Sequence, residues 1–225
     1  MCVIAIKDKN TRISYKTVKS MYETNPDGAG IAILKENKTI ILKGYMSLDL
    51  LWKDLKSLQN EDLIIHFRLA THGDCIEEFT HPFVVSSDII ECTSVSIETD
   101  KRVLVHNGII SNFGSKELSD TVDFTTRILS KIESIEDSIK ILELTGSKFV
   151  LIDNLAKDFH LVGDFHNYKG LLVSNLYFTN SFNHRIYFDD TPCYRDVYKN
   201  SEDLEDLEDR DYFLDFEKYY YKKGN

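Results

Sequence analysis

The sequence predicts an α+β fold built mainly from antiparallel sheets. Short apolar runs typical of strands occur near the start, in the middle and toward the end of the chain. Two blocks with helical periodicity interrupt them, and the order lacks the regular strand–helix alternation of a parallel sheet. With 225 residues, 42% of them hydrophobic, the chain can bury a sizeable core. We therefore expect one domain over residues 1–200 and an appendage after it.

The first half of the chain combines strands, a hairpin and two helices. The predicted elements are a strand at 2–7, a helix at 14–23, hairpin strands at 31–34 and 39–42, a helix at 48–58 and a strand at 63–67. The second helix has a capping serine, Ser47, and leucines at helical spacing. A turn at 25–28 contains Pro26 and Gly28, which favour chain reversal.

The second half repeats this mixture and ends in an acidic segment. We expect a strand at 103–105, a helix at 121–132 capped by Ser119 or Asp120, a helix at 135–144, and strands at 149–152, 159–162, 171–173 and 176–178. Residues 201–225 hold nine Asp or Glu against four Lys or Arg. This extension is predicted to be helical. Its apolar positions would either pack on the domain or dock a partner.

Composition excludes several classes of function. The net charge of −10 argues against nucleic-acid binding, which needs a basic surface. The apolar runs fall short of the roughly 18 residues of a membrane span. Lys7 follows too short an apolar run for a signal peptide. The four cysteines are widely spaced and form no CxxC pair, which predicts reduced thiols in a cytoplasm, the host's if the chain is phage-encoded.

The opening stretch, MCVIAI, places a cysteine beside the start of the chain. Cys2 fits a buried strand as a small hydrophobic side chain. Removal of Met1 would instead leave a thiol and a free α-amine on one residue, which suits nucleophilic catalysis. Both interpretations stay open on this stretch alone.

Four stretches rich in polar residues and glycine interrupt the apolar runs, at 25–30, 66–73, 80–83 and 106–108. Two of them follow strands, where loops commonly build sites. The guanidinium of Arg68 suits a carboxylate, and an Asn–Gly pair offers two N–H donors to an oxyanion. Asp120 could cap a helix or hold an ammonium. Together with a thiol, this set indicates acyl transfer on an amino-acid-like substrate.

These stretches also resemble a known family. MC at 1–2, HFRLATHG at 66–73, THPF at 80–83, VHNGIISN at 105–112 and SDT at 119–121, in that order, resemble the class II glutamine amidotransferases, which are N-terminal nucleophile hydrolases. The chain is similar to the glutaminase domain of glucosamine-6-phosphate synthase, and to small stand-alone, often phage-encoded members. The resemblance covers roughly residues 1–180. It implies a four-layer αββα sandwich and an enzyme that uses no cofactor or metal.

The resemblance implies a role for each matching residue, with L-glutamine as substrate. Cys2 would be the nucleophile and its own α-amine the general base, while Asn107 and Gly108 would form the oxyanion hole. The remaining matches would bind substrate or support the pocket: Arg68 on the α-carboxylate, assisted by Thr71 and His72; Asp120 on the α-ammonium; His81 as structural support; and Gly28 and Gly30 allowing close backbone approach.

Two departures from the family pattern bear on function. The family often has a glutamate after the Asp–Thr pair, where this chain has Val122 and then Asp123. The chain also offers no room for the synthase domain that normally uses the ammonia. We therefore expect a separate ammonia-acceptor protein, and the oligomeric state is left open.

Three rival interpretations remain. The first is a metal site drawn from the histidines and cysteines His66, His72, His81, His106, Cys75 and Cys92, although their spacing matches no compact zinc pattern. The second is an inactive glutamine-binding module. The third is a hydrolase of the same type that acts on another γ-glutamyl amide.

Overall fold

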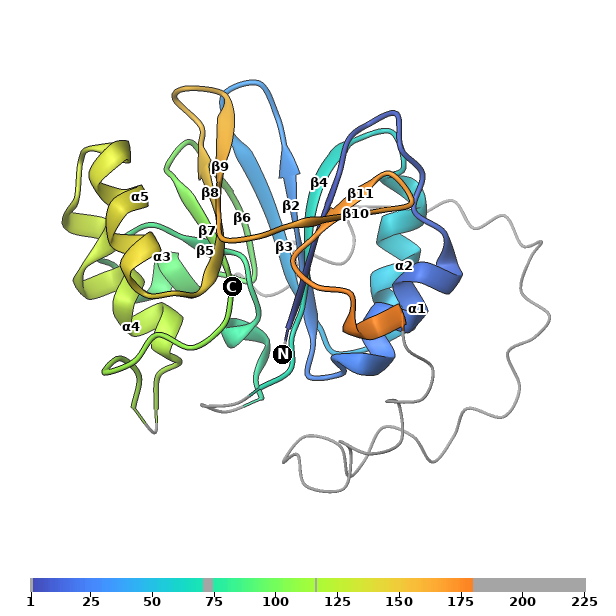
Figure 1. Ribbon diagram of the computed structural model, residues 1–225, viewed down its shortest axis with the longest axis horizontal. Coiled ribbons are helices and arrows are strands. Elements are labelled where there is room, and N and C mark those ends of the chain that lie inside the picture. Colours follow the sequence, from blue (N-terminus) through green and yellow to red (C-terminus); the bar gives the residue numbers. More distant parts are fainter. Residues whose placement is uncertain (1, 71–74, 116, 180–225) are drawn as a thin grey trace, which may run out of the picture. The chain divides into compact units, whose positions relative to one another are not determined.

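The computed structural model describes residues 2–70, 75–115 and 117–179 (Figure 1). The acidic extension at 201–225 lies outside the described residues, as do the predicted binding residues Thr71 and His72. Within the described part of the chain, no helix is long and apolar enough to cross a membrane.

The larger of two sheets has seven strands in the order β10-β11-β1-β4-β2-β3-β6. Its strands are β1 (Val3–Lys7), β2 (Ala29–Leu34), β3 (Thr39–Tyr45), β4 (Asp62–Phe67), β6 (Ser96–Thr99), β10 (His166–Tyr168) and β11 (Leu171–Val173). Every neighbouring pair is antiparallel. The N-terminal strand β1 lies inside the sheet between β4 and β11, so its backbone is paired on both sides.

The smaller sheet has four strands in the order β5-β7-β8-β9 and is also antiparallel. These strands are β5 (Phe83–Val84), β7 (Val103–Asn107), β8 (Lys148–Asp153) and β9 (Asp158–Val162). The whole of β7 is buried. Its last residue is Asn107, which places the Asn–Gly pair at the end of a strand, as the sequence predicts.

Five α-helices and three short 3₁₀ turns complete the described fold. The helices are α1 (Tyr15–Thr24), α2 (Leu48–Ser57), α3 (Ile89–Thr93), α4 (Asp120–Arg127) and α5 (Ile135–Leu144); the turns are η1 (Glu77–Phe79), η2 (Leu129–Lys131) and η3 (Tyr177–Thr179). Figure 1 shows α1 and α2 on the outer side of the larger sheet, with α3, α4 and α5 on the opposite side of the molecule.

The alternation of side chains along the strands separates three apolar layers. In β1, Val3 and Ala5 pack with residues of α1 and α2, whereas Ile4 and Ile6 face the other sheet. In β7, Val103 and Val105 complete this layer between the sheets, and Leu104 packs with residues of α4 and α5. The predicted four-layer αββα sandwich is therefore confirmed.

Several short elements differ from the prediction. The sequence did not reveal β5, β6, β10 or α3, which have two to five residues each. The predicted strand at 176–178 is wrong, because the side chain of Asn175 accepts a hydrogen bond from the Tyr177 amide and the 3₁₀ turn η3 begins there. The predicted helix at 121–132 ends at Arg127 and continues as η2. Cys2 and Cys92 are free, but Cys75 is disulfide-bonded, so uniformly reduced thiols are not observed.

Candidate functional site

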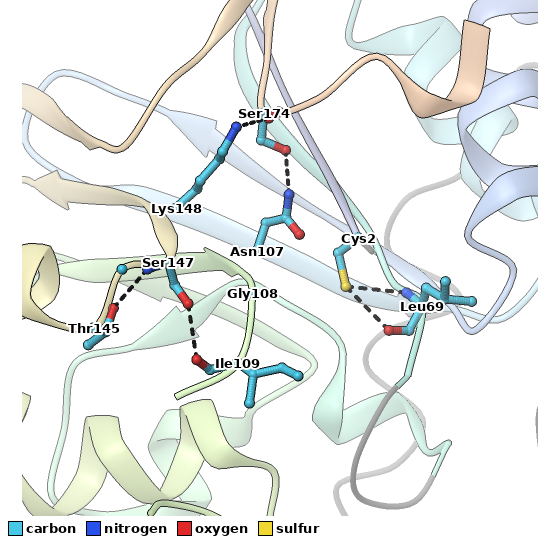
Figure 2. A pocket seen from close by; sticks show the side chains of 10 residues that line it. Cys2, Leu69, Asn107, Gly108, Ile109, Thr145, Ser147, Lys148 and Ser174 are labelled. Atoms are coloured by element: carbon cyan, nitrogen blue, oxygen red, sulfur yellow. Dashed lines mark hydrogen bonds between the residues drawn. The ribbon is translucent and has the colours of Figure 1, made fainter. Parts of the chain in front are cut away.

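A cavity of about 350 Å³ opens where ends of the two sheets meet. Ten residues line it: Cys2, Leu69, Asn107, Gly108, Ile109, Thr145, Gly146, Ser147, Lys148 and Ser174. Figure 2 shows the sulfur of Cys2 and the amide of Asn107 on the same side of this space. The three residues predicted to perform catalysis, Cys2, Asn107 and Gly108, thus share one cavity although they come from different sheets.

The thiol of Cys2 is held by the backbone of Leu69. Its sulfur accepts a hydrogen bond from the Leu69 N–H at 3.3 Å, and its S–H donates to the Leu69 carbonyl oxygen at 3.5 Å. Burial raises the pKa of the Cys2 thiol, and the hydrogen bond from Leu69 and the charge of Arg68 only partly oppose this. The resting thiol is therefore protonated at neutral pH, and a nearby base is needed to make it a nucleophile.

Gly108 adopts a backbone conformation that side chains disfavour, with φ at +152°. A Cβ atom at this position would lie 2.2 Å from Oγ of Ser147. Only glycine fits between the end of β7 and the start of β8, which explains why glycine follows Asn107 here. Asn107 is 4% exposed, and its Nδ2 donates to Oγ of Ser174 at 2.9 Å.

Arg68 follows β4 directly and is buried, but it does not line the cavity. Its N–H donates to the Gly28 carbonyl at 2.8 Å, and its carbonyl accepts from the Asp27 N–H at 3.0 Å. Oδ2 of Asp27 in turn accepts from the Ala70 N–H at 2.7 Å. Burial raises the pKa of Asp27, while hydrogen bonding from Ala70 and the charge of Arg68 oppose the rise. The sequence analysis did not identify Asp27, which fixes the backbone that carries Arg68.

Asp120 is the first residue of α4 and also lies outside the cavity lining. Its Oδ2 accepts from the Ile110 N–H at 2.7 Å, and its Oδ1 accepts from the Thr121 N–H at 2.7 Å. The helix cap is Ser119, whose hydroxyl accepts from the Val122 N–H. Asp120 thereby anchors the segment that follows Gly108, and its carboxylate has lone pairs left for a further donor.

Three buried histidines, His66, His81 and His106, lie near one another in the core. The rings of His66 and His81 are 4.2 Å apart between centroids, and those of His81 and His106 are 6.1 Å apart. Burial lowers the pKa of His66 to about 3 and that of His106 to about 4, and it lowers the pKa of His81 well below its usual value. All three are neutral near pH 7. Among the described residues, no group of three or more His, Cys, Asp or Glu side chains is arranged to hold a metal ion.

The predicted glycines Gly28 and Gly30 pack against the segment that carries His81. A Cβ on Gly30 would lie 2.0 Å from the His81 carbonyl oxygen, and one on Gly28 would lie 2.7 Å from Cγ2 of Thr80. The groups that approach Gly28 and Gly30 closely therefore belong to Thr80 and His81. Gly28 has φ at +105°, a further reason for glycine at that position.

The end of β11 contributes residues that sequence reasoning missed. Ser174 lines the cavity, and Lys148 donates from Nζ to its carbonyl oxygen at 2.6 Å. Nδ2 of Asn175 donates to the carbonyl oxygen of Cys2 at 2.7 Å. Both Ser174 and Asn175 follow an apolar strand directly, the same position that identified Arg68 and Asn107, and this signal could have revealed them.

Comparison with known proteins gives matches to one enzyme from several organisms. Glutamine–fructose-6-phosphate aminotransferase (isomerizing) of Pyrococcus horikoshii is 40% identical over 89 residues, which are 39% of this chain and 13% of that protein. The Helicobacter pylori enzyme is 33% identical over 99 residues, covering 42% and 14%. The Streptococcus pyogenes enzyme is 29% identical over 153 residues, covering 59% and 23%. The matches thus span less than a quarter of each relative's length.

Other comparisons add less. No protein-family model matches the chain. Among solved structures, glutamine phosphoribosylpyrophosphate amidotransferase from B. subtilis, complexed with ADP and GMP, has a TM-score of 0.47 and 16% identity, over 77% of this chain and 41% of that one. These sequence matches confirm the resemblance to the class II glutamine amidotransferases, with the chain a distant relative of those aminotransferases.

Proposed function

We propose that the protein hydrolyses the side-chain amide of L-glutamine through a thioester on Cys2. The observation that carries this proposal is the shared cavity, in which the Cys2 thiol and the Asn107–Gly108 pair lie together. A nucleophile beside two N–H donors is the arrangement that acyl transfer requires. The ammonia would pass to a separate acceptor protein.

The first step needs a base, because burial raises the pKa of the Cys2 thiol. The α-amine of Cys2, freed by removal of Met1, has a reference pKa near 8 and is partly unprotonated at neutral pH. The amine takes the thiol proton, directly or through a water. The sulfur then bonds to the amide carbon of glutamine, and the carbonyl oxygen becomes an oxyanion that accepts from Asn107 and the Gly108 N–H.

The second step releases ammonia and the third regenerates the enzyme. The protonated α-amine returns its proton to the amide nitrogen, the carbon–nitrogen bond breaks, and a γ-glutamyl thioester remains on Cys2. Water then adds to the thioester while the amine takes one of its protons. The carbon–sulfur bond breaks, the thiol regains a proton, and glutamate is released.

Substrate recognition is assigned to the two ends of the free amino acid. Arg68 would pair with the α-carboxylate, with Thr71 and His72 assisting, and Asp120 would pair with the α-ammonium. This assignment is supported by the positions of Arg68 and Asp120 in segments that adjoin the cavity through Leu69 and through Gly108–Ile110. His81, Gly28 and Gly30 would support the pocket from behind.

The proposal is tested by intact mass and glutamine turnover on the same sample. We expect loss of Met1, release of glutamate, and addition of one molecule of a diazoketone analogue of glutamine to the protein. Cys2→Ala should abolish both turnover and labelling. Cys92→Ala is the matched control, because Cys92 is a buried free thiol outside the cavity whose pKa burial raises to about 12.

Three results would contradict the proposal or redirect it. Unchanged turnover in Cys2→Ala, or retained Met1 in active protein, would rule out the mechanism. Glutamine binding without turnover would indicate an inactive binding module. Turnover of another γ-glutamyl amide in place of glutamine would keep the reaction type and change the proposed substrate.

A further inference from the structure

The side chain of Ser174 links the strand that follows Cys2 to the strand that ends in Asn107. Its Oγ accepts a hydrogen bond from the Ile4 N–H at 2.9 Å and another from Nδ2 of Asn107 at 2.9 Å. Its own N–H donates to the Ile4 carbonyl at 2.9 Å. Ser174 is fully buried, so these contacts cross between the two sheets without solvent access.

This arrangement leaves two complementary groups unused. Oδ1 of Asn107 is buried and has no hydrogen-bond partner in the described part of the chain. The hydroxyl proton of Ser174 likewise has no acceptor there, since both of its side-chain contacts are bonds that Oγ accepts. A serine hydroxyl carries one donor as well as its lone pairs, and a buried polar group without a partner is unfavourable.

A half-turn of the Asn107 amide satisfies both groups at once. The two ends of a carboxamide have nearly the same size, so rotation about the Cβ–Cγ bond exchanges Oδ1 and Nδ2 with little movement. Oδ1 then accepts the Ser174 hydroxyl proton, while Oγ of Ser174 still accepts from Ile4. Figure 2 shows that the end of the amide turned away from Ser174 faces Cys2. After the rotation, that end is the N–H donor.

We propose that Ser174 is a positioning residue that orients the Asn107 amide, so that Nδ2 faces the sulfur of Cys2 and can donate to the oxyanion. The Ile4 N–H favours this polarity, because it already satisfies Oγ as an acceptor, and the hydroxyl proton then gains a partner only when Oδ1 of Asn107 faces it. The inference rests on the proposed glutaminase function. It adds a third element to the site, the end of β11, which acts on the reaction only through Asn107.

The test is a double-mutant cycle on glutamine hydrolysis with Ser174→Ala, Asn107→Ala and the double variant. We expect Ser174→Ala to lower kcat at least about tenfold and to leave KM within about twofold, because the lost orientation matters only in the transition state. The double variant should be no slower than Asn107→Ala alone, since Ser174 acts through that residue. Ser174→Thr, which keeps the hydroxyl, should recover most of the lost kcat.

Ser138→Ala is the matched control. Ser138 is another fully buried serine, whose Oγ donates to the Ser134 carbonyl and accepts from Arg102, and it lies outside the cavity lining. This variant should lower the melting temperature but leave kcat unchanged. A folded Ser174→Ala variant with wild-type kcat, or a loss of rate that adds to that of Asn107→Ala, would overturn the proposal.

A second measurement does not depend on activity or on the folding of any Ser174 variant. In ¹⁵N-labelled wild-type protein, the side-chain NH₂ of Asn107, identified by its disappearance in Asn107→Asp, should show nuclear Overhauser contacts to the β-protons of Cys2. Contacts to the β-protons of Ser174 alone would overturn the proposal. An inactive wild-type protein with the expected contacts would refute the glutaminase function and leave the orientation by Ser174 standing.

Discussion

At the scale of single residues, the lining of the cavity divides the predicted site residues into two groups. Cys2, Asn107 and Gly108 line the cavity, whereas Arg68 and Asp120 lie outside the lining. The backbone of Arg68 bonds to the segment before β2, and the carboxylate of Asp120 accepts from the Ile110 N–H. Residue types, the strand-end positions of Arg68 and of the Asn107–Gly108 pair, and the family resemblance predicted these five. The strand-end position also applies to Ser174, whereas Asp27 could not be predicted, because its importance lies in a hydrogen bond to Ala70, a residue distant in sequence.

Substitution of Arg68 and of Asn107 should affect different kinetic constants. Arg68→Ala removes the charged contact proposed for glutamine before and during reaction, so KM should rise about 10- to 100-fold with a smaller change in kcat. Asn107→Ala removes an oxyanion donor and should lower kcat about 10²- to 10³-fold. Steady-state glutamate release distinguishes the two effects.

Arg127→Ala serves as the control for Arg68. The Arg127 side chain is 65% exposed and pairs with Asp123 on α4. An exposed ion pair of this kind contributes little, so both kinetic constants should stay at wild-type values. An unchanged KM in Arg68→Ala would show that Arg68 does not bind the substrate.

At the scale of elements, close packing of loops against strands shapes the rear of the site. Gly30 lies in β2, where a Cβ would meet the carbonyl oxygen of His81 at 2.0 Å and Cβ of Lys43 at 2.5 Å. The long, strongly periodic elements were predictable because their apolar spacing is a local property. The two-residue strand β5 was not, because it depends on pairing with the distant strand β7. The turn η3 was mistaken for a strand, because its apolar run hid the local hydrogen bond from the Tyr177 amide to the side chain of Asn175.

Gly30→Ala should therefore destabilise the protein through crowding. Relief of the 2.0 Å contact requires movement of the backbone at His81, so the free energy of unfolding should fall by about 1–3 kcal/mol or more. Gly146→Ala is a useful comparison, because its Cβ would meet nothing within 4 Å and only its φ of +71° opposes a side chain. Urea denaturation should show the larger loss for Gly30→Ala, and the reverse order would contradict the crowding argument.

At the scale of the whole molecule, the three buried histidines should make stability depend on pH. The pKa of His66 is lowered to about 3, that of His106 to about 4, and that of His81 well below its usual value, all chiefly by burial. In the unfolded chain these histidines would protonate near pH 6.5. Between about pH 6.5 and 4 the unfolded state therefore binds more protons than the folded state, so stability falls as pH falls.

The expected slope is up to about 1.4 kcal/mol per pH unit for each histidine, and the raised pKa of Asp27 opposes part of it. Urea midpoints measured from pH 7 down to pH 4.5 check this. His81→Phe should remove the contribution of one histidine to this slope, because phenylalanine takes up no proton on unfolding. The substitution breaks no hydrogen bond of the ring, since neither ring nitrogen of His81 has a hydrogen-bond partner among the described residues. A pH-independent midpoint over this range would contradict the placement of the three histidines in the core.

The position of β1 inside the larger sheet has a consequence for synthesis of the protein. Cys2, the proposed nucleophile, directly precedes β1, which pairs with β11, and the carbonyl oxygen of Cys2 accepts a hydrogen bond from Asn175. At roughly 5–20 residues per second, about ten to thirty seconds separate the appearance of Cys2 from that of its last neighbours. If the proposed function holds, methionine aminopeptidase would have this interval in which to remove Met1, and the nascent chain would not hydrolyse glutamine until translation has passed β11.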